Sequence, residues 1–135
     1  MSTACATRIF EDGECLVNMV RQADGYPEGH GQELFEFLSS KKITCGITNY
    51  SSETEANGLS CLAAQMIAHF KKGIGGIYLQ MPRWPQYEYE FTYDVFGDSD
   101  SMLSKVVVHD DQLEVFSGSV EAFGVWLNLR KEQAA

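Results

Sequence analysis

The amino-acid sequence predicts an α+β fold, in which an antiparallel β-sheet of about five to six strands has two to three helices packed on one face. Strand-like runs occur in consecutive hairpins in both halves of the chain, and amphipathic helical patterns lie between and after them. The 135 residues are 44% hydrophobic and contain no linker, repeat or low-complexity tract. A chain of this length can bury one core. We therefore expect residues 1–135 to form a single domain.

The first predicted element is a β-hairpin. Apolar-rich runs at residues 3–10 and 15–22 flank the dipeptide Asp12-Gly13. An Asp-Gly dipeptide readily adopts the positive φ angles that a tight turn requires. The two runs are therefore expected to pair in antiparallel orientation.

Two helices are predicted in the middle of the chain. The first covers residues 32–42 and the second residues 56–72, where apolar side chains recur at helical spacing and Gly73 provides a stop. Residues 43–47 are a possible short strand between the helices, and residues 75–81 are predicted to form a strand after the second one.

The second half of the chain predicts three strands and a final helix. Residues 87–96 alternate strictly between apolar and polar side chains, which indicates a half-buried strand. Residues 103–109 and 113–117 add two strands, and Ser119 can cap the last helix. The side chains expected to face the core from the first of these strands are Tyr87, Tyr89, Phe91, Tyr93 and Val95.

The composition favours a cytoplasmic protein without metal or cofactor. No stretch approaches the ~20 apolar residues of a spanning helix, and the N-terminus lacks the pattern of a signal peptide. The histidines are far apart, and the cysteines show no C-x-x-C pair. We expect the cysteines to be buried reduced thiols rather than disulfide or zinc ligands. They are Cys5, Cys15, Cys45 and Cys61.

The formal net charge of -9 is unevenly distributed, because residues 86–121 hold nine acidic residues against one base, Lys105. Such a surface repels nucleic acid. It could attract a basic protein surface, although ordinary solubility also produces an acidic balance of this size.

The most informative stretch is residues 24–31, DGYPEGHG, directly before the first predicted helix. Pro27 can occupy the first helical position, and Glu28 would oppose the positive end of the helix dipole. The stretch also offers a carboxylate, a phenol, an imidazole, flexible glycines and the free amides of a helix start, which accept phosphate or carboxylate groups. The candidate ligand-binding residues are Arg21, Asp24, Gly25, Tyr26, Glu28, Gly29, His30 and Gly31.

This loop needs help from other side chains to bind a ligand. The helix dipole contributes about 0.3–1 kcal/mol, rising to ~2 kcal/mol when partly buried, whereas micromolar binding requires about 8 kcal/mol. Arg21 is the best-placed additional cation. The other cations considered are Arg8, Lys41, Lys42 and Arg83.

Two other interpretations of the loop stay open. In the first, the glycines only turn the chain, Tyr26 plugs the core and Asp24 accepts hydrogen bonds within the turn. In the second, Asp24 and His30 serve as the acid and base of a small enzyme.

The segments RQADGYPEGHGQELFEFL (21–38), NGLSCLAAQMIAHFK (57–71) and GGIYL (75–79) resemble a family of small uncharacterised proteins of phages, prophages and other mobile elements. Those proteins start with a short hairpin and have an Asp-Gly-Tyr-Pro-x-Gly motif before a helix. The family commonly has a His or an aromatic residue just before the Asp. Gln22 and Ala23 stand there in this chain, which argues against an imidazole pair or a metal site at the loop.

The resemblance implies a counter-defence protein of phage type. Small phage proteins of this kind sequester a nucleotide signal or bind a host defence protein. We expect the first activity, namely non-catalytic binding of a small phosphorylated or nucleotide-like ligand in the host cytoplasm, without contact to nucleic acid or membrane. A homo-oligomer is also expected, because the aromatic side chains, including Trp84 and Trp126, could exceed what one small core hides.

The alternative is an acidic inhibitor of the anti-CRISPR type, which would bind a nucleic-acid-handling defence protein such as a CRISPR effector. Its acidic side chains would compete with nucleic acid for a basic surface. The residues proposed for this contact are Glu88, Glu90, Asp94, Asp98, Asp100, Asp110 and Asp111.

Overall fold

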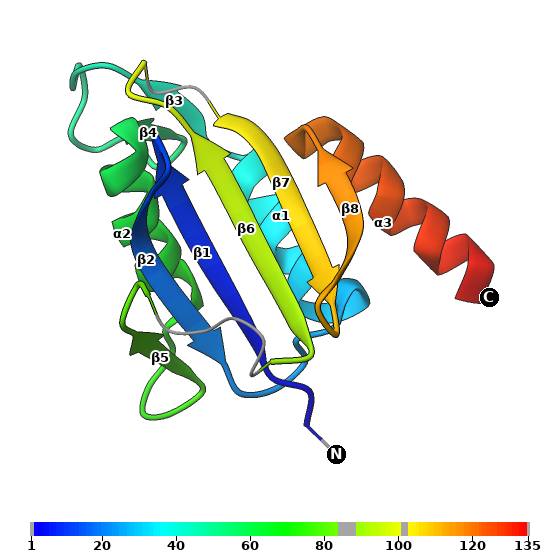
Figure 1. Cartoon of the computed structure of the whole chain (residues 1–135). Coiled ribbons are helices and arrows are strands. Elements are labelled where there is room, and N and C mark those ends of the chain that lie inside the picture. Colours follow the sequence, from blue (N-terminus) through cyan, green and yellow to red (C-terminus); the bar gives the residue numbers. More distant parts are fainter. Residues whose placement is uncertain (1, 84–88, 101–102, 135) are drawn as a thin grey trace.

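A six-stranded mixed sheet with helices on one of its faces forms the centre of the protein in the computed structural model, which describes residues 2–83, 89–100 and 103–134 (Figure 1). The strands of this sheet are β1 (Cys5–Glu11), β2 (Glu14–Arg21), β5 (Ile77–Gln80), β6 (Phe91–Gly97), β7 (Leu103–Asp110) and β8 (Leu113–Gly118). The helical segments are η1 (Pro27–Gly31), α1 (Gln32–Ser39), α2 (Gly58–Phe70) and α3 (Val120–Ala134). Two short strands, β3 (Lys42–Thr44) and β4 (Glu55–Asn57), pair in parallel as a separate small sheet.

The strands of the main sheet follow the order β5-β2-β1-β6-β7-β8 (Figure 1). The predicted hairpins are present: β1 pairs with β2, β6 with β7 and β7 with β8, all antiparallel. The central pair differs from the expectation, because β1 and β6 run parallel. After β2 the chain forms η1, α1, the small sheet, α2 and β5, and β6 then runs beside β1 in the same direction. The α+β class is confirmed, and the sheet is mixed rather than antiparallel throughout.

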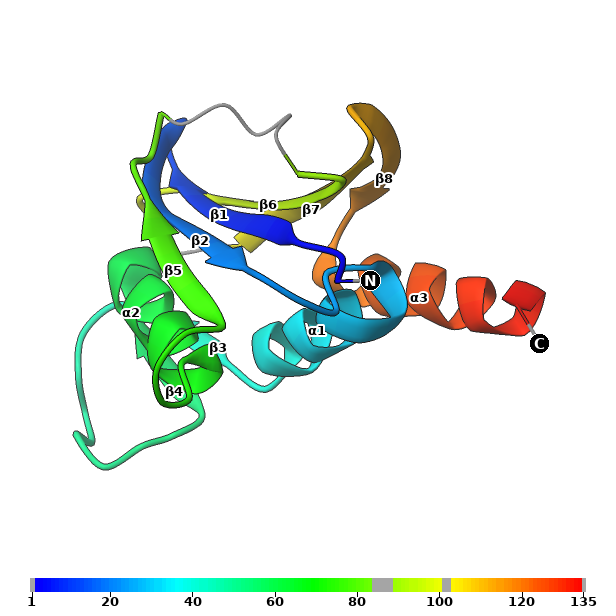
Figure 2. The ribbon, with the colours of Figure 1, turned by 90° about the horizontal axis from the view of Figure 1, so that it is seen from below.

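The hydrophobic core lies between the sheet and the helices, which all lie on one side of the sheet (Figure 2). Phe91, Tyr93 and Val95 of β6 are buried in this core as predicted. The strand is not half-buried, however, because Thr92 and Asp94 on its other face are also buried, at 2% and 3% exposure. Tyr89 precedes the strand, and Tyr87 lies outside the described residues. The helices contribute these fully or almost fully buried side chains to the same core: Leu34, Phe37, Leu38, Leu59, Leu62, Ala63, Met66, Phe123 and Leu127.

Local sequence signals explain several of the element boundaries. Asp12 and Gly13 adopt φ angles of 50° and 85° in the turn between β1 and β2, as the Asp-Gly dipeptide predicts. The side-chain oxygen of Ser119 accepts a hydrogen bond from the Ala122 amide at 3.0 Å, so it caps α3 as expected. Pro27 is the first residue of η1, a π-helical turn that continues directly into α1.

The cysteines differ from the prediction of four buried thiols. All four are free, but only Cys5 is buried, whereas Cys15 and Cys61 are partly buried and Cys45 is exposed. Cys45 follows the short strand β3 in a loop where the neighbouring Ile47 is also 48% exposed. Apolar neighbours in the sequence therefore did not indicate burial at this loop.

Candidate functional site

The loop before η1 is fixed to the sheet by backbone contacts. The Gly25 amide donates to the Thr3 carbonyl at 2.8 Å, and the buried Tyr93 hydroxyl donates to the Gly25 carbonyl at 2.8 Å. A Cβ atom at residue 25 would lie 2.7 Å from Cys5 Cβ, so only glycine permits this close approach. The backbone at Gly25 is therefore a structural contact and is not open to a ligand.

Three amides at the start of the helix, those of Gly29, His30 and Gly31, are already bonded, contrary to the expectation of free donors. The Gly29 and Gly31 amides donate to the Tyr26 carbonyl at 3.0 and 3.4 Å, and the His30 amide donates to the Asp24 carbonyl at 2.7 Å. The π-helical turn folds the carbonyls of the loop back over these donors, because Asp24 adopts a left-handed φ of 60°. An anion at the helix start would have to displace these internal bonds.

His30 is a core residue rather than a surface ligand. Its side chain is completely buried, and its ring lies 5.0 Å from the Phe70 ring and 5.2 Å from the Tyr93 ring between centroids. Burial, together with the positive charge of Arg21, lowers the pKa of His30 from 6.5 to about 3. The imidazole is therefore neutral at physiological pH. This position does not fit the proposed acid and base pair with Asp24.

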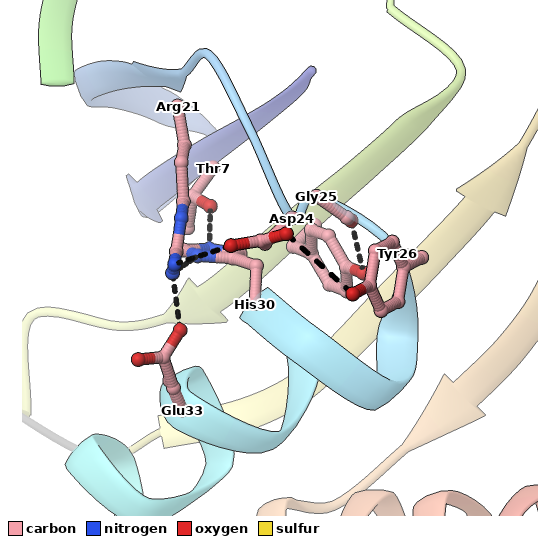
Figure 3. A network of polar contacts seen from close by, with 8 residues as sticks. Thr7, Arg21, Asp24, Gly25, Tyr26, His30 and Glu33 are labelled. Atoms are coloured by element: carbon pink, nitrogen blue, oxygen red, sulfur yellow. Dashed lines mark hydrogen bonds and ion pairs between the residues drawn. The ribbon is translucent and has the colours of Figure 1, made fainter. Parts of the chain in front are cut away.

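Arg21 connects the buried histidine to the surface (Figure 3). Its guanidinium contacts His30 Nδ1 at 3.3 Å and also donates to the Glu33 carboxylate. A second nitrogen of the guanidinium lies 3.9 Å from the Asp24 carboxylate. The Arg21 side chain is only 19% exposed, whereas those of Asp24 and Glu33 are 62% and 49% exposed. The arginine is thus held in place and its two acidic partners face solvent.

A cavity of about 450 Å³ opens beside this guanidinium. Its lining residues come from the end of β2, the start of β5, α1 and the end of α2. Its charged lining residues are of both signs, namely the cations Arg21 and Lys72 and the acids Asp24 and Glu33. The complete lining consists of Arg21, Gln22, Ala23, Asp24, Glu33, His69, Phe70, Lys72, Gly75, Gly76 and Ile77.

The residues predicted from the loop therefore fall into three groups. Arg21 and Asp24 line the cavity. Glu28 instead accepts a hydrogen bond from Arg130 of α3 at 3.1 Å, and Tyr26 is 40% exposed, so it does not plug the core. The other predicted members, Gly25, Gly29, His30 and Gly31, have structural positions.

The part of the cavity wall that lies outside the loop before η1 was not predicted from the sequence. Lys72, Gly75 and Gly76 belong to the segment after α2, which was not expected to meet residues 21–24. The strand predicted for residues 75–81 is shorter in the structure, since β5 covers Ile77–Gln80. The Gln22 amide donates to the Gly76 carbonyl at 2.9 Å and joins the two segments. The sequence of a glycine-rich turn does not indicate which distant segment the turn will contact. The contact with residues 21–24 follows from the pairing of β2 with β5, which the sequence did not predict.

The acidic residues of the alternative hypothesis do not share one surface. Asp94 is 3% exposed and forms a two-point ion pair with Arg8, with both contacts at 2.8 Å. Burial raises the pKa of Asp94, and Arg8 opposes this effect. Asp98 and Asp100 lie after the end of β6, whereas Glu90, Asp110 and Asp111 lie at its opposite end, where the Asp111 amide donates to the Glu90 carbonyl. Glu88 lies outside the described residues.

Other candidate sites are smaller or lack charged partners. A second cavity of about 170 Å³ lies between the loop after β3 and the start of α2, and Glu55 is the single charged residue among those that line it in the described chain. Within residues 2–83, 89–100 and 103–134, no three His, Cys, Asp or Glu side chains are grouped so that they could hold a metal ion. None of the helices described is long and apolar enough to cross a membrane.

The fold and the larger cavity thus define an α+β domain with a pocket of mixed charge where its sheet meets two helices. Comparison of the chain with protein-family models, with curated proteins and with solved structures finds no match.

Proposed function

We propose that the protein binds a small phosphorylated or nucleotide-like ligand in the cavity beside Arg21, without catalysis. The observation that supports this most directly is the meeting of a fixed guanidinium, a lysine and an aromatic ring around one space of about 450 Å³. Pockets for small molecules and cofactors typically measure about 300–1,000 Å³ and combine apolar walls with a few oriented polar groups.

Arg21 and Lys72 are the groups proposed to receive the anionic part of the ligand. Arginine suits phosphate because its planar guanidinium can donate two parallel hydrogen bonds. Asp24 and Glu33 now compete for that guanidinium, but both carboxylates are about half exposed or more, at 62% and 49%. Exposed ion pairs contribute only about 0–1 kcal/mol, so a phosphate group can replace them at little cost.

The remainder of the pocket suits a planar group with hydrogen-bond donors. Phe70 supplies an aromatic wall, and Gly75 and Gly76 leave the rim free of side chains. Asp24 and Glu33 can accept hydrogen bonds from ring N–H, amino or ribose hydroxyl groups of the ligand. A nucleotide combines all three features, namely an anionic group, a planar ring and donors.

The proposed biological role is sequestration of a nucleotide signal of the host. This role rests on the resemblance of residues 21–38, 57–71 and 75–79 to small phage and prophage proteins, which implies an activity in the host cytoplasm. Binding alone would achieve sequestration, because a ligand held by the protein is withdrawn from its receptor. Catalysis by the Asp24 and His30 pair is not proposed, since both nitrogens of the buried imidazole have internal partners.

A thermal-shift panel tests this function. The panel contains inorganic phosphate, mononucleotides, and cyclic mono- and dinucleotides. A ligand present at 100 times its Kd should add about 2.7 kcal/mol to the free energy of unfolding and so raise the melting temperature. Lys72→Gln should reduce that shift, and Lys42→Gln, which changes a lysine outside the cavity lining, should preserve it. A panel in which no member raises the midpoint would contradict the proposal for these ligands.

A further inference from the structure

We infer that Thr7 and His30 are positioning residues, which hold the Arg21 guanidinium in one orientation at the wall of the cavity. The effect of this positioning on ligand affinity rests on the function proposed above. The hydrogen bonds of His30 with Thr7 and Arg21 are present in the free protein and can be examined without a ligand.

The direction of the two hydrogen bonds follows from the chemistry of arginine. A guanidinium can donate but cannot accept, so Arg21 Nη1 donates to His30 Nδ1 across 3.3 Å. Nδ1 therefore has no proton, and the neutral ring has its proton on Nε2. That Nε2–H donates to Thr7 Oγ1 at 2.7 Å. The contacts on the two sides of the ring thus agree on a single tautomer (Figure 3).

The packing leaves the ring little freedom to change this arrangement. His30 is completely buried and lies against Phe70 and Tyr93. Thr7 is also completely buried, on the central strand β1. Rotation of the ring about its χ2 angle would place a C–H group against Thr7 Oγ1 and would remove the acceptor from Arg21. Such a loss of buried partners is costly, so the ring acts as a rigid support.

A rigid support matters because Arg21 reaches the cavity at the end of β2. A free arginine side chain loses much rotamer freedom when it binds a ligand, whereas one already held by His30 loses less. The exposed carboxylates of Asp24 and Glu33 can move aside, but the buried acceptor stays in place. The orientation of the guanidinium is therefore set from inside the domain.

The tautomer can be measured directly by ¹⁵N-detected histidine NMR on the free protein at pH 7. The inference requires a proton on Nε2 of His30 and an unprotonated Nδ1. Thr7→Ser, which keeps the hydroxyl, should preserve the His30 signals, and Thr7→Val, which keeps the shape of the side chain, should shift the Nε2 signal. A proton on Nδ1, or an Nε2 signal that does not respond to Thr7→Val, would overturn the inference whatever the ligand.

A matched pair of His30 variants tests the link to binding. His30→Asn keeps an acceptor near the position of Nδ1, whereas His30→Gln keeps a polar group near the position of Nε2. With adenosine monophosphate as the probe, we expect His30→Asn to retain most of the affinity and His30→Gln to lose about tenfold. Equal affinities for two folded variants would overturn the positioning role.

The outcomes separate this inference from the proposed function. If the wild-type protein shows the Nε2–H tautomer but binds no nucleotide or phosphate, the proposed function fails and the contact stands. If nucleotides bind and the tautomer is the other one, the function stands and the positioning role is wrong. If either His30 variant fails to fold, the positioning role is tested by adenosine monophosphate binding to Thr7→Ser and Thr7→Val. We then expect only Thr7→Val to bind more weakly than the wild-type protein.

Discussion

His30 is kept neutral at the centre of the domain by burial and by the nearby positive charge of Arg21, which lower its pKa to about 3. In the unfolded chain the same side chain has an ordinary pKa near 6.5. The unfolded state therefore takes up a proton first when the pH falls. The stability that neutral His30 contributes is complete above about pH 6.5 and is lost progressively between about 6.5 and 3.

Acidification should for this reason destabilise the wild-type protein more than His30→Asn. Each unit of pH below about 6.5 should cost on the order of 1.4 kcal/mol, because one pKa unit corresponds to that free energy. Asp94, whose pKa is raised by burial, acts in the opposite direction in both proteins and so cancels in the comparison. Urea unfolding at pH 7.5 and pH 5 measures the difference. Identical losses of stability in the two proteins would show that His30 is not neutral and buried.

Two glycines of η1 provide a graded test of packing around the loop. A Cβ at residue 29 would lie 2.6 Å from the Asp24 carbonyl oxygen, a backbone atom that cannot move aside without breaking the turn. A Cβ at residue 31 would meet side chains of Leu127 and Tyr93 at 3.3 Å, which can adjust slightly.

We expect Gly29→Ala to reduce the free energy of unfolding by about 2 kcal/mol or more and Gly31→Ala to reduce it by less. Chemical denaturation of both variants gives the comparison. If Gly31→Ala proved the more harmful, the turn would have to follow a different path from the one described.

At the scale of the elements, the parallel pairing of β1 and β6 is the feature that the sequence did not predict. Local patterns correctly indicated the hairpins, because alternation and an Asp-Gly turn act between neighbouring segments. The partner of β1 on its other side is determined by the path of the helices, and it cannot be inferred from either strand alone. The ion pair between Arg8 and Asp94 joins these two strands at directly paired positions.

Asp94→Asn should therefore destabilise the protein by about 3 kcal/mol, as expected when one partner of a buried ion pair is neutralised. Asp111→Asn, at an exposed turn position where asparagine also tolerates the φ of 50°, is the matched control and should have little effect. Equal stabilities of the two variants in equilibrium unfolding would contradict the described register of β1 and β6.

Local sequence patterns predicted only part of the candidate site, because they do not determine which distant segments meet. Arg21 and Asp24 were identified because they flank a glycine-rich loop before a helix. Glu33 and Lys72 were missed because they reach the cavity from α1 and from the segment after α2, and their place beside residues 21–24 depends on tertiary packing. His30 was included among the ligand-binding candidates because it lies in the glycine-rich loop before the first helix, whereas burial between two aromatic rings has no signature in a single sequence.

At the scale of the whole molecule, the sheet and helices create one larger cavity at the edge formed by β2 and β5, while the acidic side chains are divided between both ends of β6. The cavity and the separation of the acidic side chains favour the ligand-binding hypothesis over the hypothesis of an acidic interface for a defence protein. The homo-oligomer stays a prediction. Trp126, one of the residues on which it rested, is packed against Phe116 and Phe123 within the domain, and Trp84 lies outside the described residues.

Calorimetric titration of a cavity-blocking variant tests the central claim most directly. Ala23 lines the cavity and is exposed, so Ala23→Trp should fill the space with little effect on the core. Ala68, an exposed residue of α2 outside the lining, provides the control Ala68→Trp. We expect the best nucleotide of the thermal-shift panel to bind to the wild-type protein and to Ala68→Trp, and we expect Ala23→Trp to weaken its binding by at least about tenfold. Undiminished binding to a folded Ala23→Trp protein would contradict it.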